Sequence, residues 1–554
     1  MHRFYHVFIL SAAAVACCAF AVPGADHHNR RPDDLPKILA ASFKKDTFNI
    51  VKFGAKPDGI TLNSLSIQKA IDACSHNGGG TVFVPPGLWL TGPLVLKSNV
   101  NLSLSAGAVL QFSDKPSDYP LVQTNWEGLD AIRAQSPISA SDAENVGITG
   151  GGSIDGAGQA WRPVKKSKVT PPEWNQLIKS GGVLDEKQET WYPSVGALKG
   201  SLAKRPGVIA EGYDRIKADA IKEFLRPNLV SLLRCKRVLL AGVTFQNSPA
   251  WCLHPLLSQH ITVSYVTVRN PWNAQNGDGI DVESCSHVLI ENSSFDVGDD
   301  AICMKSGRDE EGRKRGVATE AVIVRNCTVY HGHGGFVIGS EMSGGVNNVF
   351  VSDCNFIGTD VGLRFKTARG RGGVVEQIFV NNIRMSAIGG AAILFDMYYM
   401  AQDPLTIFGG DGKVIAEPHP VTEATPQFRD FYIDGVVCKG AETAIFVRGL
   451  PEMSIRNIQL ENISIQGKNG FVCTDGEDII LKNATLHSDA SAAVVMQNSK
   501  GVSLENISYR TSDVFLQISG QRSKNINIRR TDTSKVKKAV ELGDGVSNSV
   551  VNIQ

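Results

Sequence analysis

The sequence lacks an excess of charge of either sign. Its 554 residues include 56 Lys plus Arg and 55 Asp plus Glu, which gives a formal net charge of +1. Charged residues make up 20% of the chain and apolar residues 42%. This balance does not carry the basic footprint of a nucleic-acid-binding protein, and it is typical of neither a disordered tail protein nor a membrane bundle. We therefore expect a globular protein with no nucleic-acid partner.

Long apolar runs are also missing beyond the amino terminus, so we expect no transmembrane segment. One short apolar run, Val7 to Phe20, follows the basic start and ends near the small residues Ala19 and Ala21. This pattern predicts a signal peptide over residues 1–21 and export of the mature protein to the periplasm, the medium or the cell surface. A lipoprotein signal with acylation at Cys17 or Cys18 is the alternative.

The sequence contains no CxxC or HExxH pattern, so we expect neither a metal nor another cofactor. After removal of the signal peptide, nine of the 11 Cys remain. Cys285, Cys303, Cys327 and Cys354 recur at intervals of 18, 24 and 27 residues. We interpret them as small apolar residues stacked inside a repetitive core, rather than as a disulfide framework.

A short theme repeats along the chain: a polar residue, an aliphatic residue, any residue, and a second aliphatic residue. Examples are His260-Ile-Thr-Val and Asn457-Ile-Gln-Leu, and from Val238 the first five steps are 23, 27, 34, 27 and 29 residues. The alternation has the period of a strand with one buried face. Strands that recur every 20 to 30 or so residues, too far apart for hairpins, predict an all-β parallel solenoid forming one domain over residues 48–554.

Three stretches interrupt the repeat. Apolar residues at helical spacing between Ser66 and Cys74 predict a helix that caps the open end of the first coil. Residues 156–235 and 398–427 are expected to be loop insertions, which in solenoids protrude from one face and build the binding cleft. The first insertion contains Trp161, Trp174 and Trp191, which form either a small satellite core or a sugar-binding platform.

An acidic cluster recurs over about one coil. Asn276-Gly-Asp278 is followed by Asp299-Asp300, and Asp278 and Asp299 are 21 residues apart. Because neighbouring parallel strands lie about 4.8 Å apart, these three carboxyl groups are expected to lie close together. Crowded carboxylates do not all ionise easily, so at least one pKa is expected to rise toward that of a general acid. We interpret Asp281, two residues after Gly279, as a local turn residue.

The next coils bring an imidazole and two cations. Gly332-His333-Gly334 lies one coil beyond the acids, and Arg364-Phe365-Lys366 lies one coil further. Taken singly, each has a structural explanation: a packed loop histidine, and cations on a solvated strand face. Their succession on consecutive coils instead predicts one ladder of functional groups along a single face.

These four motifs resemble those of the polygalacturonases and their relatives, glycoside hydrolase family 28. The family's Asn-Thr-Asp, Gly-Asp-Asp, Gly-His-Gly and Arg-Ile-Lys match the four segments above in order, with Gly277 in place of Thr and Phe365 in place of Ile. The stretch that starts at Phe53-Gly-Ala-Lys-Pro-Asp-Gly is similar to the family's bacterial branch. The resemblance implies a right-handed parallel β-helix and hydrolysis with inversion at the anomeric carbon.

The resemblance also implies roles for these residues. Asp299 would be the general acid, while Asp278 and Asp300 would hold and deprotonate the attacking water. Inverting enzymes usually separate their carboxyl groups by about 6.5–9.5 Å to fit that water. The remaining assignments are tuning of the acid by His333 and substrate binding by Arg364, Lys366 and Asn276.

Long insertions are similar to those of exo-acting members, so we expect a monomeric enzyme that releases galacturonic acid from galacturonan or a rhamnogalacturonan-derived oligosaccharide. Two alternatives stay open. A pectate lyase-like eliminase shares the fold and substrate, and would use the acidic cluster as Ca²⁺ ligands. A non-catalytic β-solenoid adhesin would bind carbohydrate without cleaving it.

Overall fold

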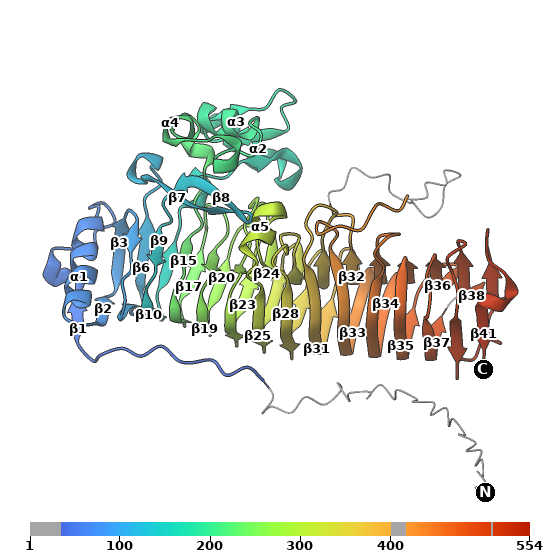
Figure 1. Ribbon diagram of the computed structural model, residues 1–554. Coiled ribbons are helices and arrows are strands. Elements are labelled where there is room, and N and C mark those ends of the chain that lie inside the picture. The colour runs from blue at the N-terminus through green and yellow to red at the C-terminus, as the bar shows by residue number, and fades with distance from the viewer. Residues whose placement is uncertain (1–34, 400–416, 511–512) are drawn as a thin grey trace, which may run out of the picture. The chain divides into compact units, whose positions relative to one another are not determined.

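Three ladders of parallel strands wind around a common core in the computed structural model, which describes residues 35–399, 417–510 and 513–554 (Figure 1). Each coil contributes one strand to each ladder, and the register passes from coil to coil with few shifts. Because crossover connections between parallel strands are right-handed, the coils form a right-handed parallel β-helix. The predicted fold class is confirmed.

The ladder that carries the site is built from short strands with both faces buried along much of its length. In order, its strands are β9 (Ile138–Ser141), β15 (Val230–Leu233), β18 (Leu253–Leu256), β21 (Ile280–Glu283), β24 (Asp300–Lys305), β27 (Gly334–Ile338), β30 (Leu363–Lys366) and β32 (Ala391–Asp396).

The other two ladders complete each coil. The second runs through β2 (Gly80–Val84), β5 (Val100–Leu104), β10 (Glu144–Gly150), β16 (Lys236–Ala241), β19 (Gln259–Ser264), β22 (Ser286–Glu291), β25 (Thr319–Arg325), β28 (Val346–Ser352) and β31 (Val374–Ser386). The third runs through β3 (Gly87–Thr91), β6 (Ala108–Phe112), β11 (Ser153–Asp155), β17 (Thr244–Gln246), β20 (Thr267–Arg269), β23 (Ser294–Asp296), β26 (Thr328–His331) and β29 (Asn355–Ile357). Later coils merge into the longer strands β33 (Gln427–Arg448), β34 (Ile455–Thr474) and β35 (Gly476–His487).

The repeated theme of the sequence marks one corner of every coil. Its first aliphatic residues stack in register, as in Val238, Ile261 and Val288, and these side chains are fully buried. The polar residue before each one adopts a left-handed backbone conformation, with φ of 53° at Arg237 and 56° at His260. Asn and Asp tolerate this conformation best, which explains why they recur at the position.

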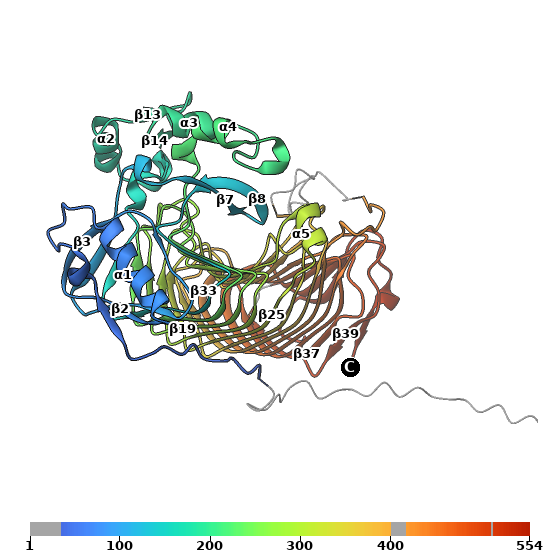
Figure 2. The same cartoon turned by 60° about the vertical axis from the view of Figure 1, so that its left-hand side comes forward.

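Helix α1 (Ser64–His76) covers the first coil, and Figure 2 shows it at the end of the strand stack. Its buried residues are Ile67, Ala70, Ile71 and Cys74, which are the four predicted from helical spacing. All nine described cysteines are buried and none forms a disulfide. Eight of them lie in the apolar core, as expected, whereas Cys303 is buried on the other side of β24, level with Asp281.

Between β11 and β15 the chain leaves the coils and forms α2 (Pro171–Lys179), α3 (Val195–Ser201), α4 (Arg215–Asp219) and a small sheet, β12 (Val164–Lys165), β13 (Val183–Leu184) and β14 (Thr190–Tyr192). Both views place these helices on one side of the coils (Figures 1 and 2). Trp161, Trp174 and Trp191 are at most 7% exposed, which argues against a sugar platform, and Trp161 packs with Tyr119 and Ala134 in a small satellite core.

A second excursion was not expected from the sequence. The antiparallel hairpin β7 (Leu121–Trp126) and β8 (Leu129–Ala134) leaves the coil between β6 and β9. The insertion expected over residues 398–427 falls largely outside the described residues, as does the segment that carries the expected signal peptide and Cys17 and Cys18. Among the residues that the structure describes, no helix is both long and apolar enough to cross a membrane.

Candidate active site

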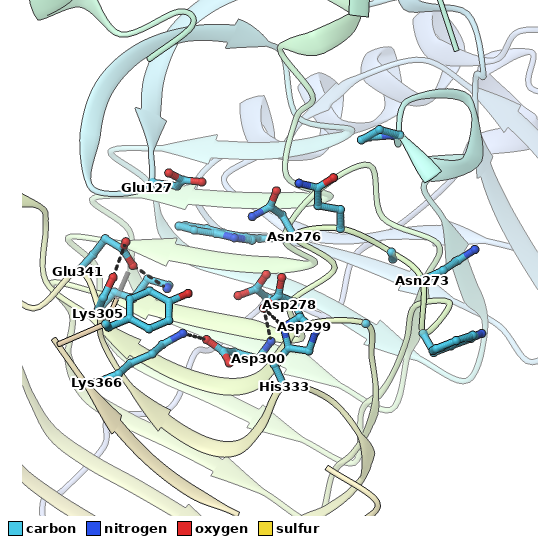
Figure 3. Close-up of a pocket in the computed structure, with 18 of the residues that line it drawn as sticks. Glu127, Asn273, Asn276, Asp278, Asp299, Asp300, Lys305, His333, Glu341 and Lys366 are labelled. Carbon is cyan, nitrogen blue, oxygen red and sulfur yellow. Dashed lines mark hydrogen bonds and ion pairs between the residues drawn. The ribbon is translucent and has the colours of Figure 1, made fainter. Parts of the chain in front are cut away.

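The three predicted aspartates meet at the start of two adjacent strands. Asp278 lies two residues before Ile280 in β21, Asp300 lies two residues before Ile302 in β24, and Ile280 pairs with Ile302. Asp278 and Asp300 therefore occupy equivalent positions on neighbouring coils. One carboxylate oxygen from each of these two residues and from Asp299 lies within 4.8 Å of the others. Figure 3 shows the three side chains grouped on one side of the cavity.

The three carboxyl groups differ in exposure and partners. Asp278 and Asp300 are 3% and 2% exposed, whereas the Asp299 side chain is 22% exposed. Both oxygens of Asp300 are paired: Arg364 Nη1 lies 3.1 Å from Oδ1, and Lys366 Nζ lies 2.7 Å from Oδ2. Oδ1 of Asp278 accepts no hydrogen bond from any described residue.

These surroundings separate the pKa values of the cluster. Burial, together with the negative charges of Asp281 and Asp299, raises the pKa of Asp278 well above its ordinary value. Burial also works to raise the pKa of Asp300, but Lys366 and Arg364 outweigh it and hold that pKa below its ordinary value. The expected rise is therefore present, and it falls on Asp278.

His333 lies beside the most exposed aspartate. Its Nδ1 is 3.0 Å from Asp299 Oδ1, and its Nε2 is 3.7 Å from a carboxylate oxygen of Asp360. The hydrogen bond to Asp299 raises the pKa of His333 above its ordinary value, although partial burial opposes the change. His333 and Asp299 thus form a hydrogen-bonded acid–imidazole pair at the mouth of the cluster.

The other predicted residues also border this cluster. Arg364 and Lys366 come from β30, and Tyr399 covers them, with Lys366 Nζ 4.5 Å from the ring centroid. Asn276 has φ of 53°, and its Oδ1 accepts a hydrogen bond of 2.8 Å from the buried Arg226. Gly277 fits a tight turn, because a Cβ at this position would lie 2.6 Å from Cβ of Ala274.

The interpretation of Asp281 as a turn residue was wrong. Asp281 is the second residue of β21, it is fully buried, and neither of its oxygens accepts a hydrogen bond from the described residues. Lys305 Nζ lies 3.6 Å from its Oδ1 and 3.0 Å from Oε2 of Glu341. Burial raises the pKa of Asp281 well above its ordinary value, and the negative charges of Asp300 and Asp299 add to the rise, although Lys305 opposes it.

A cavity of about 430 Å³ opens over the aspartates. Its wall contains groups that the repeat gave no reason to select: Glu127, Trp251, Trp272, Lys305, Arg308, Glu341 and Arg371. Lys305 ends β24, the strand that starts at Asp300, whereas Glu341 lies three residues beyond the end of β27. Glu127 and Trp272 lie on turns outside the strands, where sequence period carries no information.

A second cavity of about 310 Å³ adjoins the first. The two share the lining residues Glu127, Pro163, Gln275, Asn276 and Arg308. The second cavity is otherwise lined by the β7–β8 hairpin and the first insertion, including Arg133, Tyr192, Arg205 and Phe224. The acidic cluster borders only the larger cavity.

Comparisons with known proteins agree with this geometry. A family model described as glycosyl hydrolases family 28 matches residues 214–408, and one described as rhamnogalacturonase A/epimerase, pectate lyase-like, matches residues 47–110. The exo-poly-alpha-D-galacturonosidase of Dickeya chrysanthemi is 30% identical over 456 residues, which cover 79% of this chain and 70% of the relative. The chain belongs to glycosyl hydrolases family 28.

Further relatives extend the match over most of the chain. A probable polygalacturonase of Vitis vinifera is 28% identical, with 86% of this chain and 87% of the relative covered. The crystal structure of a hyperthermoactive exopolygalacturonase from Thermotoga maritima superposes with a TM-score of 0.59 at 28% identity, covering 89% of this chain and 94% of that one. As a family 28 member, the chain is a glycoside hydrolase on a parallel β-helix.

Proposed function

We propose that this family 28 enzyme hydrolyses α-1,4-galacturonosyl linkages of pectin from the non-reducing end and releases galacturonic acid. The single observation that carries the proposal is the grouping of Asp278, Asp299 and Asp300 in a cavity lined by cations. A polyuronate presents one carboxylate per sugar, and such a substrate needs both features. Relatives described as exo-acting support the same activity.

Asp299 is proposed as the general acid. It is the most exposed of the three carboxyl groups, so it can reach the glycosidic oxygen of a bound chain. His333 donates to or accepts from it at 3.0 Å and shares the proton that the leaving oxygen requires. The raised pKa of Asp278, caused first by its burial, favours a further proton within the cluster.

Asp278 and Asp300 are proposed to hold the attacking water. Two hydrogen bonds of about 2.8 Å that meet at one water span roughly 4.6 Å, which is compatible with oxygens that lie within 4.8 Å of each other. Asp300 stays ionised because Arg364 and Lys366 flank it, so it can accept the proton that the water loses. The water attacks the anomeric carbon as the bond to the leaving oxygen breaks.

Inversion is favoured over retention, even though the oxygens lie closer than the carboxyl separation usual for inverting enzymes. A retaining mechanism needs a free carboxylate nucleophile. Both oxygens of Asp300 are engaged by cations, and the raised pKa of Asp278 favours its neutral form. Neither group is therefore a good nucleophile, which leaves water to attack directly.

Recognition of a uronate is assigned to the cations of the cavity. Arg364 and Lys366 lie beside the reacting groups, and Lys165, Lys168 and Arg371 stand further around the wall. An Arg fork pairs well with a carboxylate, and the local cations attract a polyanion despite the near-neutral charge of the chain. Asn276 is proposed to contact a sugar hydroxyl through its amide.

Exo action is supported by a bridge across the cleft. The tip of the β7–β8 hairpin meets helix α5 (Asp309–Arg315) and the residue before it: Arg308 pairs with Glu127 at 3.0 Å and Arg315 with Asp130 at 3.9 Å. The backbone N–H of Asp130 also donates to Glu311 at 3.1 Å. A polymer does not thread past such a bridge, so only a chain end enters the cavity.

The deciding experiment is product analysis on a defined oligogalacturonide. Release of galacturonic acid alone from the first turnover supports exo hydrolysis, whereas a mixture of mid-length products overturns it. Anomeric NMR of the fresh product distinguishes inversion from retention. Matched digestion of a rhamnogalacturonan-derived oligosaccharide tests the wider substrate range.

The acidic cluster supports a Ca²⁺-dependent lyase less well. Calcium takes six to eight oxygen ligands, whereas the oxygens of Asp300 already pair with Arg364 and Lys366. A divalent cation would also be repelled by those neighbours. A non-catalytic adhesin would have no need for an acid–imidazole pair next to two buried aspartates.

A pectin substrate lies outside the cell, so we propose that the enzyme is exported, as its amino-terminal sequence predicts. Fractionation of the source cells with and without lipid extraction tests export and anchoring.

We also propose that it acts as a monomer. Light scattering on the purified protein tests the oligomeric state.

A further inference from the structure

Glu127 is a carboxylate in the cavity that the proposed chemistry does not use. It stands at the tip of the β7–β8 hairpin with φ of 48°, and it lines both the larger and the smaller cavity. Figure 3 draws it on the hairpin side of the cavity, across from Lys366 and Asp300. Its position is therefore at the closed end, where a bound chain would terminate.

Its partner is a cation that lines the same two cavities. Arg308 Nη1 lies 3.0 Å from Glu127 Oε2, and the two side chains are 23% and 32% exposed. A fully engaged structural ion pair would be buried or would lie outside the cavity, whereas this pair keeps part of its surface toward the cavity. Burial raises the pKa of Glu127 above its ordinary value, and the nearby charge of Glu341 adds to the rise, whereas Arg308 and Lys305 oppose it.

The terminal residue of a galacturonan carries two neighbouring groups that an internal residue does not offer together: a free hydroxyl at C4 and the carboxylate at C5. To bind both substituents, the site needs a hydrogen-bond acceptor for the hydroxyl next to a cation for the carboxylate. A carboxylate accepts the hydroxyl proton, and a guanidinium binds the uronate. The pair of Glu127 and Arg308 presents both functions about one hydrogen-bond length apart.

We propose that Glu127 and Arg308 recognise the non-reducing terminal uronate, Glu127 by accepting a hydrogen bond from the C4 hydroxyl and Arg308 by binding the C5 carboxylate. This inference rests on the proposed exo hydrolysis and adds the group that defines the chain end. It assigns Glu127 to specificity and leaves bond cleavage to the aspartates.

Chain ends made by elimination lack the C4 hydroxyl, because the lyase reaction leaves a 4,5-double bond. When such an end binds, Glu127 finds no C4 hydroxyl to donate a hydrogen bond to it. The bound sugar also excludes water, so the Glu127 carboxylate is left without a replacement partner, near Glu341. A site built to bind a hydroxyl rejects an analogue that lacks it far more strongly than a hydrophobic pocket rejects a missing methylene. The enzyme should therefore process hydrolase-made ends and reject lyase-made ends.

The test compares saturated and 4,5-unsaturated trigalacturonate as substrates for the wild type, Glu127→Gln and Glu127→Ala. We expect the wild type to prefer the saturated substrate by about 100-fold or more in kcat/KM. Glu127→Ala should lower kcat/KM on the saturated substrate by about 10- to 100-fold, Glu127→Gln less, and neither should change the unsaturated substrate by more than about threefold.

Asp130→Asn is the matched control. Asp130 belongs to the same hairpin tip and pairs with Arg315 of α5, but its side chain is 73% exposed and it does not line the cavity. A variant that only loosens the bridge should change kcat/KM by the same factor on both substrates. The expected result for Asp130→Asn is an unchanged preference between them.

The outcomes separate the two proposals. Equal wild-type rates on both substrates, or equal loss on both in Glu127→Ala, overturn the role of Glu127 while exo hydrolysis stands. Absence of hydrolysis of either substrate by the wild type overturns the proposed function and this inference with it.

Discussion

Asp278 and Asp300 occupy the same place on two neighbouring coils, yet their surroundings push their pKa values in opposite directions. The difference arises from β30, two coils beyond Asp300, whose Arg364 and Lys366 reach Asp300 at 3.1 and 2.7 Å. One repeated backbone position thereby supplies a carboxyl whose pKa is raised and another whose pKa is lowered.

Replacement of Asp299 by Asn should lower kcat on polygalacturonate by about 10²- to 10⁴-fold, because an amide cannot protonate the leaving oxygen. A reducing-sugar assay measures the loss. Asp296→Asn is the matched control, since Asp296 forms a similar 2.9 Å contact with His331 on the exposed face of the same coils. Equal activity of Asp299→Asn and wild type would remove Asp299 from catalysis.

The alkaline limb of the pH–activity profile should belong to the His333–Asp299 pair. The hydrogen bond raises the pKa of His333, so the shared proton is retained to higher pH than on a free imidazole and is lost as the pH rises through the raised value. In His333→Asn only carboxyl groups can hold this proton. They lose it at lower pH than an imidazole does, so the alkaline limb of the profile should move to lower pH. Profiles of kcat/KM for both proteins measure the shift, and superimposable alkaline limbs would contradict it.

Removal of metal should not change the rate. The cations around Asp300 already balance the acidic cluster, so the hydrolysis needs no Ca²⁺. Assays with and without a chelator should agree, and no ultraviolet absorbance from an unsaturated product should develop. Loss of activity with chelator and recovery with Ca²⁺ would support the lyase instead.

Much of the site could be predicted because it lies on the repeat. The coil period brings Asp278 and Asp300 into one column, and side chains at equivalent positions of a parallel ladder must be neighbours. Lys366 lies further along β30 and reaches Asp300 through the length of its side chain. Asp281 shows the limit of that reasoning. All four residues of its strand are buried, and Asp281 lies beside Lys305, although the glycine two residues earlier indicated an exposed turn.

The closed end of the cleft could not be predicted in the same way. Glu127 and Arg308 are 181 residues apart, and neither lies at a repeated strand position. Their meeting depends on how the β7–β8 hairpin folds back, for example through Trp126 stacking on Trp251 at 5.6 Å between ring centroids. Sequence period carries no signal for contacts between two loops.

The end cap should dominate the stability of the first coils. Ile71 of α1 is fully buried against them, and its replacement by Ala should lower the free energy of unfolding by about 2–5 kcal/mol through lost burial and a residual cavity. Leu65→Ala on the same helix is the control, because Leu65 is 78% exposed and its loss should cost less than about 0.5 kcal/mol. Urea unfolding measures both. Equal destabilisation would mean that helix propensity rather than packing holds the cap, whereas loss at Ile71 alone identifies α1 as the cover of the open coil.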